Sequence, residues 1–139
     1  MIYDVSYGII PLKKYQNGWQ VFIVQHKKGN HFGFPKGHAN ISETEKEAAL
    51  RELKEETNLE VLRFLAEKPL MEHYTFHENS KIISKKVYYY LAEVKGDFKI
   101  DLNEIIDGKW VDINLAKDIL THEASKKIAI QVENILQNL

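Results

Sequence analysis

The feature that most constrains this sequence is a helix-forming segment, RELKEE at residues 51–56, with three glutamates on one face. At about 100° per residue, Glu56 lies roughly 40° to one side of Glu52, and Glu55 lies roughly 60° to the other side. Leu53 points elsewhere and is free to pack on a core. The segment therefore predicts a helix with one apolar face and one strongly acidic face.

Such an acidic face destabilises a helix unless a cation neutralises it. Like charges four residues apart cost roughly 0.2–0.5 kcal/mol per pair, and the macrodipole disfavours anions near the helix C-terminus. Arg51 can reach Glu47 and Glu55 on neighbouring turns. Glu52 and Glu56 have no equally placed basic partner. Oxygen ligands at this density suit Mg²⁺ or Mn²⁺, and Mg²⁺ normally brings phosphates with it. The alternative is a solvated acidic surface.

Composition narrows the protein class. A chain of 139 residues with 44% hydrophobic residues fits one folded domain, residues 1–139. No apolar run approaches the roughly 20 residues that span a bilayer, and no signal peptide is visible. The absence of cysteine excludes disulfides and thiolate metal sites. With a formal net charge of -1, an anionic substrate needs local basic groups or metal ions. We expect a cytoplasmic monomer that binds a small molecule and no membrane.

The order of the predicted elements indicates an α/β fold. Residues 2–12 and 19–26 are rich in Val, Ile, Tyr and Phe and flank Asn17-Gly18, which is typical of a hairpin. Further strands are expected near residues 60–66, 70–76, 82–95 and 108–113. A short helical turn after Asn114 and an amphipathic helix from about Glu123 to Leu136 end the chain. A helix on each side of a mixed sheet gives an α/β/α arrangement.

The helix that carries RELKEE has recognisable ends. Ser42 and Glu45 fit a capping box, so the helix is expected to begin there and to run to about Thr57. Asn58 can adopt the left-handed conformation that ends a helix. The preceding loop, residues 26–38, is long and rich in Gly, Lys and His, which is unusual for a passive connection. This loop is therefore a candidate phosphate-binding segment.

The spacing of Gly37, Glu43 and RELKEETNL at residues 51–59 resembles the Nudix box, a loop–helix–loop signature. Asn58 stands where that family has a glycine, and Asn tolerates the same backbone region. The resemblance implies the Nudix fold, an α/β/α sandwich around a mixed β-sheet. It also implies cleavage of a nucleoside diphosphate that is linked to another group.

The resemblance also implies roles for individual residues. Arg51 would orient the glutamates, and Glu43 would brace the motif. Glu55 would be a metal ligand or the general base. In some members of the family the residue matching Glu52 or Glu55 deprotonates water, and this assignment varies. The metal ligands that the box implies are the carbonyl of Gly37 and the carboxylates of Glu52, Glu55 and Glu56.

Three further segments resemble asymmetrically cleaving diadenosine tetraphosphate hydrolases: FPKGH at residues 34–38, KKVYYYLAEVK at residues 85–95, and Asn103-Glu104 followed by Trp110. This likeness implies hydrolysis of diadenosine tetraphosphate to ATP and AMP. It assigns phosphate contacts to Lys36, His38 and Lys85, and a metal ligand to Glu104. Adenine would stack on Tyr74, with His122 as a weaker candidate for the opposite wall.

Other interpretations of these residues remain open. His38 could be an ordinary loop histidine, and Lys85 could lie at a solvated strand end. The four histidines without motif support, His26, His31, His73 and His77, are expected to be surface or packing residues. The alternative enzymes are an RNA 5′-pyrophosphohydrolase and a nucleoside triphosphate pyrophosphatase. A non-catalytic nucleotide sensor is an alternative of another class. Loss of a box glutamate would indicate such a sensor, and none is missing.

Overall fold

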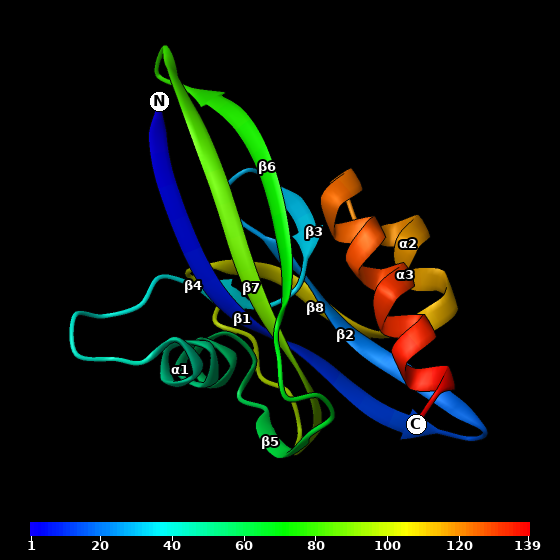
Figure 1. The fold of residues 1–139 in the computed structure, drawn as a ribbon. Helices are drawn as coiled ribbons and strands as arrows, with labels where there is room; N and C mark the ends of the chain where they lie inside the picture. Colours follow the sequence, from blue (N-terminus) through cyan, green and yellow to red (C-terminus); the bar gives the residue numbers. More distant parts are fainter.

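A computed structural model of the chain describes residues 1–139 and contains one eight-stranded mixed sheet with helices on both faces (Figure 1). The strands are β1 (Ile2–Tyr15), β2 (Gly18–His26), β3 (His31–Gly33), β4 (Lys36–Gly37), β5 (Glu60–Phe64), β6 (Leu70–Glu78), β7 (Lys81–Lys95) and β8 (Ile105–Asp112). The helices are α1 (Glu45–Thr57), α2 (Ala116–Ile119) and α3 (Glu123–Gln137), and a 3₁₀ turn covers Ile113–Leu115.

The sheet is organised around two long neighbouring strands, β1 and β7, which run parallel from Ile2↔Ile83 to Leu12↔Glu93. The strand order is β3-β2-β1-β7-β5, while β4 pairs with β1, β6 with β7, and β8 with β2, all antiparallel. The predicted central strand 87–94 is confirmed, since most of its residues are buried within β7. The predicted hairpin of residues 2–12 and 19–26 is also confirmed.

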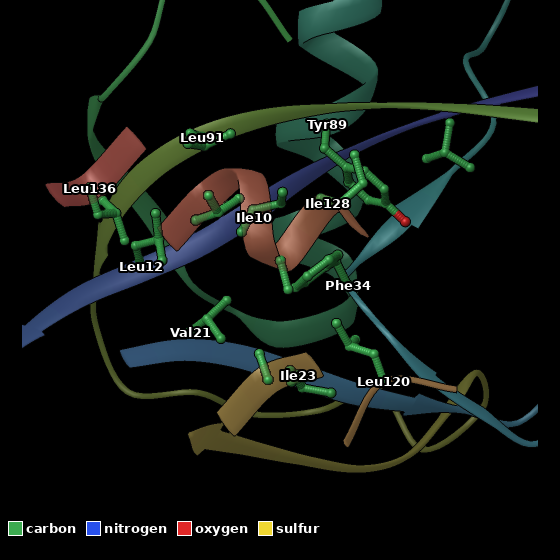
Figure 2. Packing of buried hydrophobic residues seen from close by; sticks show 14 residues of the cluster. Ile10, Leu12, Val21, Ile23, Phe34, Tyr89, Leu91, Leu120, Ile128 and Leu136 are labelled. Atoms are coloured by element: carbon green, nitrogen blue, oxygen red, sulfur yellow. The ribbon is translucent and has the colours of Figure 1, made fainter. Parts of the chain in front are cut away.

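Each face of the sheet has its own hydrophobic core. Helix α3 packs Ile128, Val132 and Leu136 onto one face, against Ile10 and Leu91 among others (Figure 2). The predicted packing of this amphipathic helix on the sheet is therefore confirmed. Helix α1 places Ala49 and Leu53 on the opposite face. The layers form the expected α/β/α arrangement.

Helix α1 begins with a different cap from the predicted one. Thr44, not Ser42, is the N-cap: its hydroxyl accepts from the Glu47 N–H at 3.1 Å, and the Glu47 carboxylate accepts from the Thr44 N–H at 2.8 Å. The prediction failed because both residues fit the same S/T-x-x-E pattern. A turn in which Glu43 bonds Asn40 through its backbone and its side chain leaves Ser42 outside the helix.

The other end of α1 is as predicted. Asn58 has a φ of 66° in the left-handed region, and its N–H donates to the carbonyl of Lys54. The helix therefore ends at Thr57, and β5 begins at Glu60. None of the helices is both long and apolar enough to cross a membrane.

Beyond the packed layers, the start of β1, the end of β6 and the start of β7 form a three-stranded extension (Figure 1). On one face of this extension the register places Asp4 beside Lys85, and Lys85 beside Tyr74. Helix α3 packs beside β6. Strand β4 pairs with Tyr7 and Gly8 of β1, and so places Lys36 and Gly37 next to the extension. The extension therefore supplies one wall of a cleft.

Candidate active site

A cleft with a volume of about 1250 Å³ lies beside α1. Its walls come from α1, from the extension of β1, β6 and β7, from the N-terminal half of α3, and from the loops at residues 26–31 and 103–104. It contains nearly every residue that the sequence assigns to the site: Lys36, Gly37, His38, Arg51, Glu52, Glu56, Tyr74, Lys85, Glu104 and His122. Glu55 does not line it. The fold thus gathers two groups, one acidic and one basic, in one cavity.

The acidic group consists of Glu52, Glu56 and Glu104, which bring one carboxylate oxygen each to within 4.8 Å of one another. Glu52 and Glu56 come from successive turns of α1 and are buried. Glu104 is exposed and comes from the loop before β8. Its carbonyl accepts from the Lys27 N–H at 2.9 Å, which fixes this loop beside the end of β2. We call these three residues the carboxylate cluster.

The electrostatics of the carboxylate cluster fit a divalent cation. Burial, with the neighbouring Glu52 and Glu104 charges, raises the pKa of Glu56 to about 9. Burial also raises the pKa of Glu52, although Arg51 opposes this shift. Carboxylates that are this costly to ionise gain most from a metal ion, and the all-oxygen donor set suits Mg²⁺ or Mn²⁺. The residues present therefore fit the expected cofactor.

The Arg51 side chain forms hydrogen bonds that connect α1 to the loop before it. Its guanidinium donates to both carboxylate oxygens of Glu43, at 2.6 and 3.0 Å, and to the carbonyl of His38 at 2.8 Å. The same side chain donates to Glu52 at 2.9 Å and to Glu55 at 3.1 Å. The predicted pair with Glu47 is wrong because Glu47 caps the helix. The expectation that Glu52 lacks a basic partner is also wrong.

Glu55 and Gly37 occupy different positions relative to the cluster. The Glu55 side chain is 54% exposed and lies outside the cluster, so its role as ligand or base remains a prediction. Gly37 lies in β4, opposite Tyr7, with its backbone against the Glu52 carboxyl group. A Cβ at residue 37 would collide with that carboxyl group. The site therefore requires glycine here, while a metal contact from its carbonyl remains a prediction.

The basic group contains Lys36, Lys85 and His38, the three predicted phosphate contacts. Burial lowers the pKa of Lys36, and the neighbouring Lys85 charge adds to this effect. The Lys36 backbone N–H donates to Glu56 at 3.1 Å, which joins the basic group to the carboxylate cluster. The Lys85 ammonium is buried and donates to Asp4 at 2.7 Å and to Ser6 at 2.5 Å. Lys85 is thus not a solvated strand end.

Two acidic residues, Asp4 and Glu72, lie beside the basic group and were not predicted from the sequence. Asp4 accepts from Lys85 and from the His38 ring at 2.9 Å. Glu72 is buried on β6 and accepts from the Tyr89 hydroxyl at 3.2 Å and the Ser125 hydroxyl at 3.0 Å. Burial raises the pKa of Glu72, against the opposing effect of Ser125 and Lys36. For Glu72 the sequence offered only a weak indication, namely a single acidic residue at an inward-facing position of β6.

A row of aromatic rings forms another wall of the cleft. Tyr74 and His122 stack with centroids 5.3 Å apart, and the row continues through His31 at 4.9 Å and His26 at 4.8 Å. Tyr74 and His122 therefore contact each other and are not two walls with room for an adenine between them. His26 is a buried packing residue, as expected, and its ring lies 3.1 Å from the carbonyl of Phe34. Both His26 and His31 nevertheless line the cleft.

This fold, with a carboxylate-bearing helix beside a cleft, matches a known family. The NUDIX domain matches residues 3–132, so the chain belongs to the NUDIX domain family. A solved structure described as a C. elegans Ap4A hydrolase binary complex has the same fold, with a TM-score of 0.74 and 21% identity. That match covers 97% of this chain and 98% of the other. The predicted Nudix fold is thereby confirmed.

Two proteins with similar sequences are named for different activities. An RNA pyrophosphohydrolase of a Nitratiruptor species is 40% identical over 90 residues, which are 56% of this chain and 56% of the relative. An asymmetrical bis(5′-nucleosyl)-tetraphosphatase of Rattus norvegicus is 31% identical over 99 residues, which are 70% of this chain and 66% of the relative. The chain thus spans between about half and two thirds of the length of these relatives.

Proposed function

We propose that this protein is a metal-dependent hydrolase that cleaves diadenosine tetraphosphate asymmetrically into ATP and AMP. In this reaction the oxygen of a water molecule bonds to a phosphorus atom, and one bridging P–O bond breaks. The observation that carries the proposal is the position of the carboxylate cluster in the same cleft as Lys36 and Lys85. The likeness to the rat tetraphosphatase supports the choice of substrate.

Each group has a distinct part in the proposed reaction. Glu52, Glu56 and Glu104 would hold Mg²⁺ or Mn²⁺, which makes a bound water more acidic and neutralises phosphate oxygens. Lys36, Lys85 and His38 would bind the phosphate chain beside the metal. Arg51 would keep Glu52 and Glu55 in position. Phosphoryl transfer depends mainly on such positioning and charge neutralisation.

The adenosine end of the substrate would contact the aromatic wall. Tyr74 and His122 already stack on each other, so an adenine would bind against the side of this row or would separate the two rings. Aromatic faces of this kind attract nucleobases regardless of their sequence. A cytoplasmic location and a monomeric state belong to the same proposal.

A second candidate is removal of pyrophosphate from the 5′ end of RNA, which the 40% identity to an RNA pyrophosphohydrolase favours. Both reactions cut a polyphosphate attached to a 5′ carbon, so the carboxylate cluster suits either. The two substrates differ in the group beyond the first nucleoside, which is a second adenosine in one and an RNA strand in the other. The formal net charge of -1 favours the small substrate, because RNA binding gains from a basic surface.

One experiment separates these candidates. Purified protein with Mg²⁺ is given diadenosine tetraphosphate, 5′-triphosphorylated RNA or single nucleoside triphosphates, and the products are identified by chromatography. ATP plus AMP from the dinucleotide, at the highest kcat/KM of the panel, is the expected result. Two ADP molecules, or faster release of pyrophosphate from RNA, would contradict the substrate assignment. Binding without turnover of any substrate would indicate a sensor. Protein carrying Glu56→Gln serves as the control for contaminating hydrolases.

A further inference from the structure

The predicted phosphate contacts Lys85 and His38 already hold an anion, which is the carboxylate of Asp4. One carboxylate oxygen of Asp4 accepts from the His38 ring at 2.9 Å, and the other accepts from the Lys85 ammonium at 2.7 Å. The carboxylate thus occupies the position between two donors in which a phosphate with two free oxygens would fit.

Asp4 is placed there by strand register. In the parallel pair of β1 and β7, Asp4 lies directly beside Lys85, with both side chains on the face that lines the cleft. The Lys85 side chain is only 6% exposed, whereas those of Asp4 and His38 are 34% and 68% exposed. Asp4 is therefore the more exposed member of its ion pair with Lys85. A phosphate oxygen that took the place of Asp4 beside the Lys85 ammonium and the His38 ring would displace this carboxylate.

Lys85 has other polar neighbours besides Asp4. The Ser6 hydroxyl accepts from Lys85 at 2.5 Å, and the buried Glu72 carboxyl group of β6 interacts electrostatically with the lysine. Asp4 is the direct ion-pair partner of Lys85 and bonds the His38 ring as well. A carboxylate at that place repels an incoming phosphate and competes for the same donors.

We propose that Asp4 is an intramolecular competitor of the phosphate chain: its carboxylate occupies the Lys85–His38 position and is displaced when a polyphosphate binds. Asp4 thereby sets a threshold of ligand charge. A chain of several phosphates exceeds this threshold, and a single phosphate group, as in the product AMP, does not. This inference rests on the proposed function for its biological meaning, but the competition itself is testable without turnover.

The experiment measures binding of inorganic tripolyphosphate by calorimetry in metal-free buffer, where no hydrolysis takes place. We expect Asp4→Asn to bind tripolyphosphate roughly tenfold more tightly than the unchanged protein, since one negative charge near the anion is removed. Asn keeps the oxygen that accepts from Lys85. Asp118→Asn, at an exposed position of α2, is the matched control and leaves the affinity unchanged.

A double-variant comparison tests whether Asp4 acts through Lys85. In a Lys85→Met background, Asp4→Asn gives less than a twofold gain in affinity. An equal gain in both backgrounds would show a general charge effect and would overturn the proposal. Unchanged or weaker binding by a folded Asp4→Asn protein would also overturn it, because Asp4 would then only support Lys85. Thermal unfolding of each variant verifies that it is folded.

A measurement on the unchanged protein covers the case in which Asp4→Asn does not fold. The ¹³C signal of the Asp4 carboxyl group shifts on titration with tripolyphosphate if the carboxylate is displaced, and remains in place under equimolar orthophosphate. No shift at saturating tripolyphosphate overturns the proposal. If these results hold but no nucleotide is hydrolysed, the proposed function alone fails. If nucleotides are hydrolysed but Asp4 does not move, the competition alone fails.

Discussion

The acidic and basic groups of the cleft differ in how far neighbouring residues neutralise their charges. The carboxylate cluster brings the carboxyl groups of Glu52, Glu56 and Glu104 together, with Arg51 hydrogen-bonded to Glu52 and Lys36 near Glu56. The basic group holds two lysines, Lys36 and Lys85, but the protein supplies Asp4 and Glu72 as their counter-ions. Unbalanced charge at one site favours the binding of a divalent cation there. At the balanced site, according to our proposal, a phosphate group replaces the Asp4 carboxylate.

The largest expected effect is the loss of activity when a carboxylate is removed from the carboxylate cluster. Glu56→Gln removes a buried carboxylate from the cluster, and we expect kcat to fall by about a hundredfold or more, because metal contacts supply several kcal/mol to such reactions. Steady-state rates with the preferred substrate measure this effect. Glu67→Gln, at an exposed position without ion pairs, is the control. Near-normal rates of Glu56→Gln at saturating Mg²⁺ would contradict the metal assignment.

The second prediction concerns the raised pKa of Glu56 and its effect on stability. Because the folded pKa of Glu56 is about 9, above its ordinary 4.5, the stability that this carboxyl contributes is present below pH 4.5 and is lost as the pH rises toward 9. Without metal, the free energy of unfolding should fall relative to that of Glu56→Gln by about 1.4 kcal/mol per pH unit in this window. Urea unfolding at pH 5.5 and 7.5 measures the difference.

Addition of Mg²⁺ at pH 7.5 should restore stability to the unchanged protein and have a smaller effect on Glu56→Gln. A pH-independent difference between the two proteins would mean that Glu56 is already ionised and compensated without metal. The contrast between the unbalanced and balanced sites would then disappear.

The third prediction concerns Gly37, the glycine beside the Glu52 carboxyl group. In Gly37→Ala the new Cβ collides with the Glu52 carboxyl group and displaces it. We expect Mn²⁺ affinity, measured by calorimetry, to fall by about tenfold or more, the usual effect of disturbing the support of a metal ligand. Gly18→Ala is the matched control, because a Cβ there meets no atom within 4 Å. Equal Mn²⁺ affinities of the two variants would contradict the geometry.

The smallest expected effect is at the balanced site. Lys85→Met removes a charged donor but keeps the apolar stem, so KM should rise by about tenfold with little change in kcat, the effect of losing a charge-assisted hydrogen bond. Lys86→Met is the matched control, since the adjacent side chain is exposed on the other face of β7. An unchanged KM in Lys85→Met would refute the phosphate contact.

Sequence reasoning succeeded where the site is local in the chain. Helical spacing alone puts Glu52 and Glu56 on one face, and the motif spacing connects them to Gly37. It was less accurate where two local patterns were equivalent, as for Ser42 and Thr44 at the start of α1. The choice between them depended on a turn made by Glu43, whose side chain is also engaged by Arg51.

Sequence reasoning failed where partners lie far apart in the chain. Asp4 and Lys85 are brought together by the parallel register of β1 and β7, and no short pattern encodes that register. Likewise, Glu72 meets Ser125 only because α3 packs beside β6. The stacking of Tyr74 on His122 has the same origin and removed the expected gap between two walls.

The parallel pairing of β1 with β7 also bears on how the protein is made. On the ribosome, residues 2–12 are synthesised long before residues 83–93, to which they pair. Helix α1 can form as soon as it emerges, but β1 lacks its main neighbour until β7 has been synthesised. The acidic half of the cleft therefore has its helix early, and the basic half, which contains Lys85, is assembled late. A nascent chain that stalls before β7 would expose the apolar middle of β1 and be prone to aggregation.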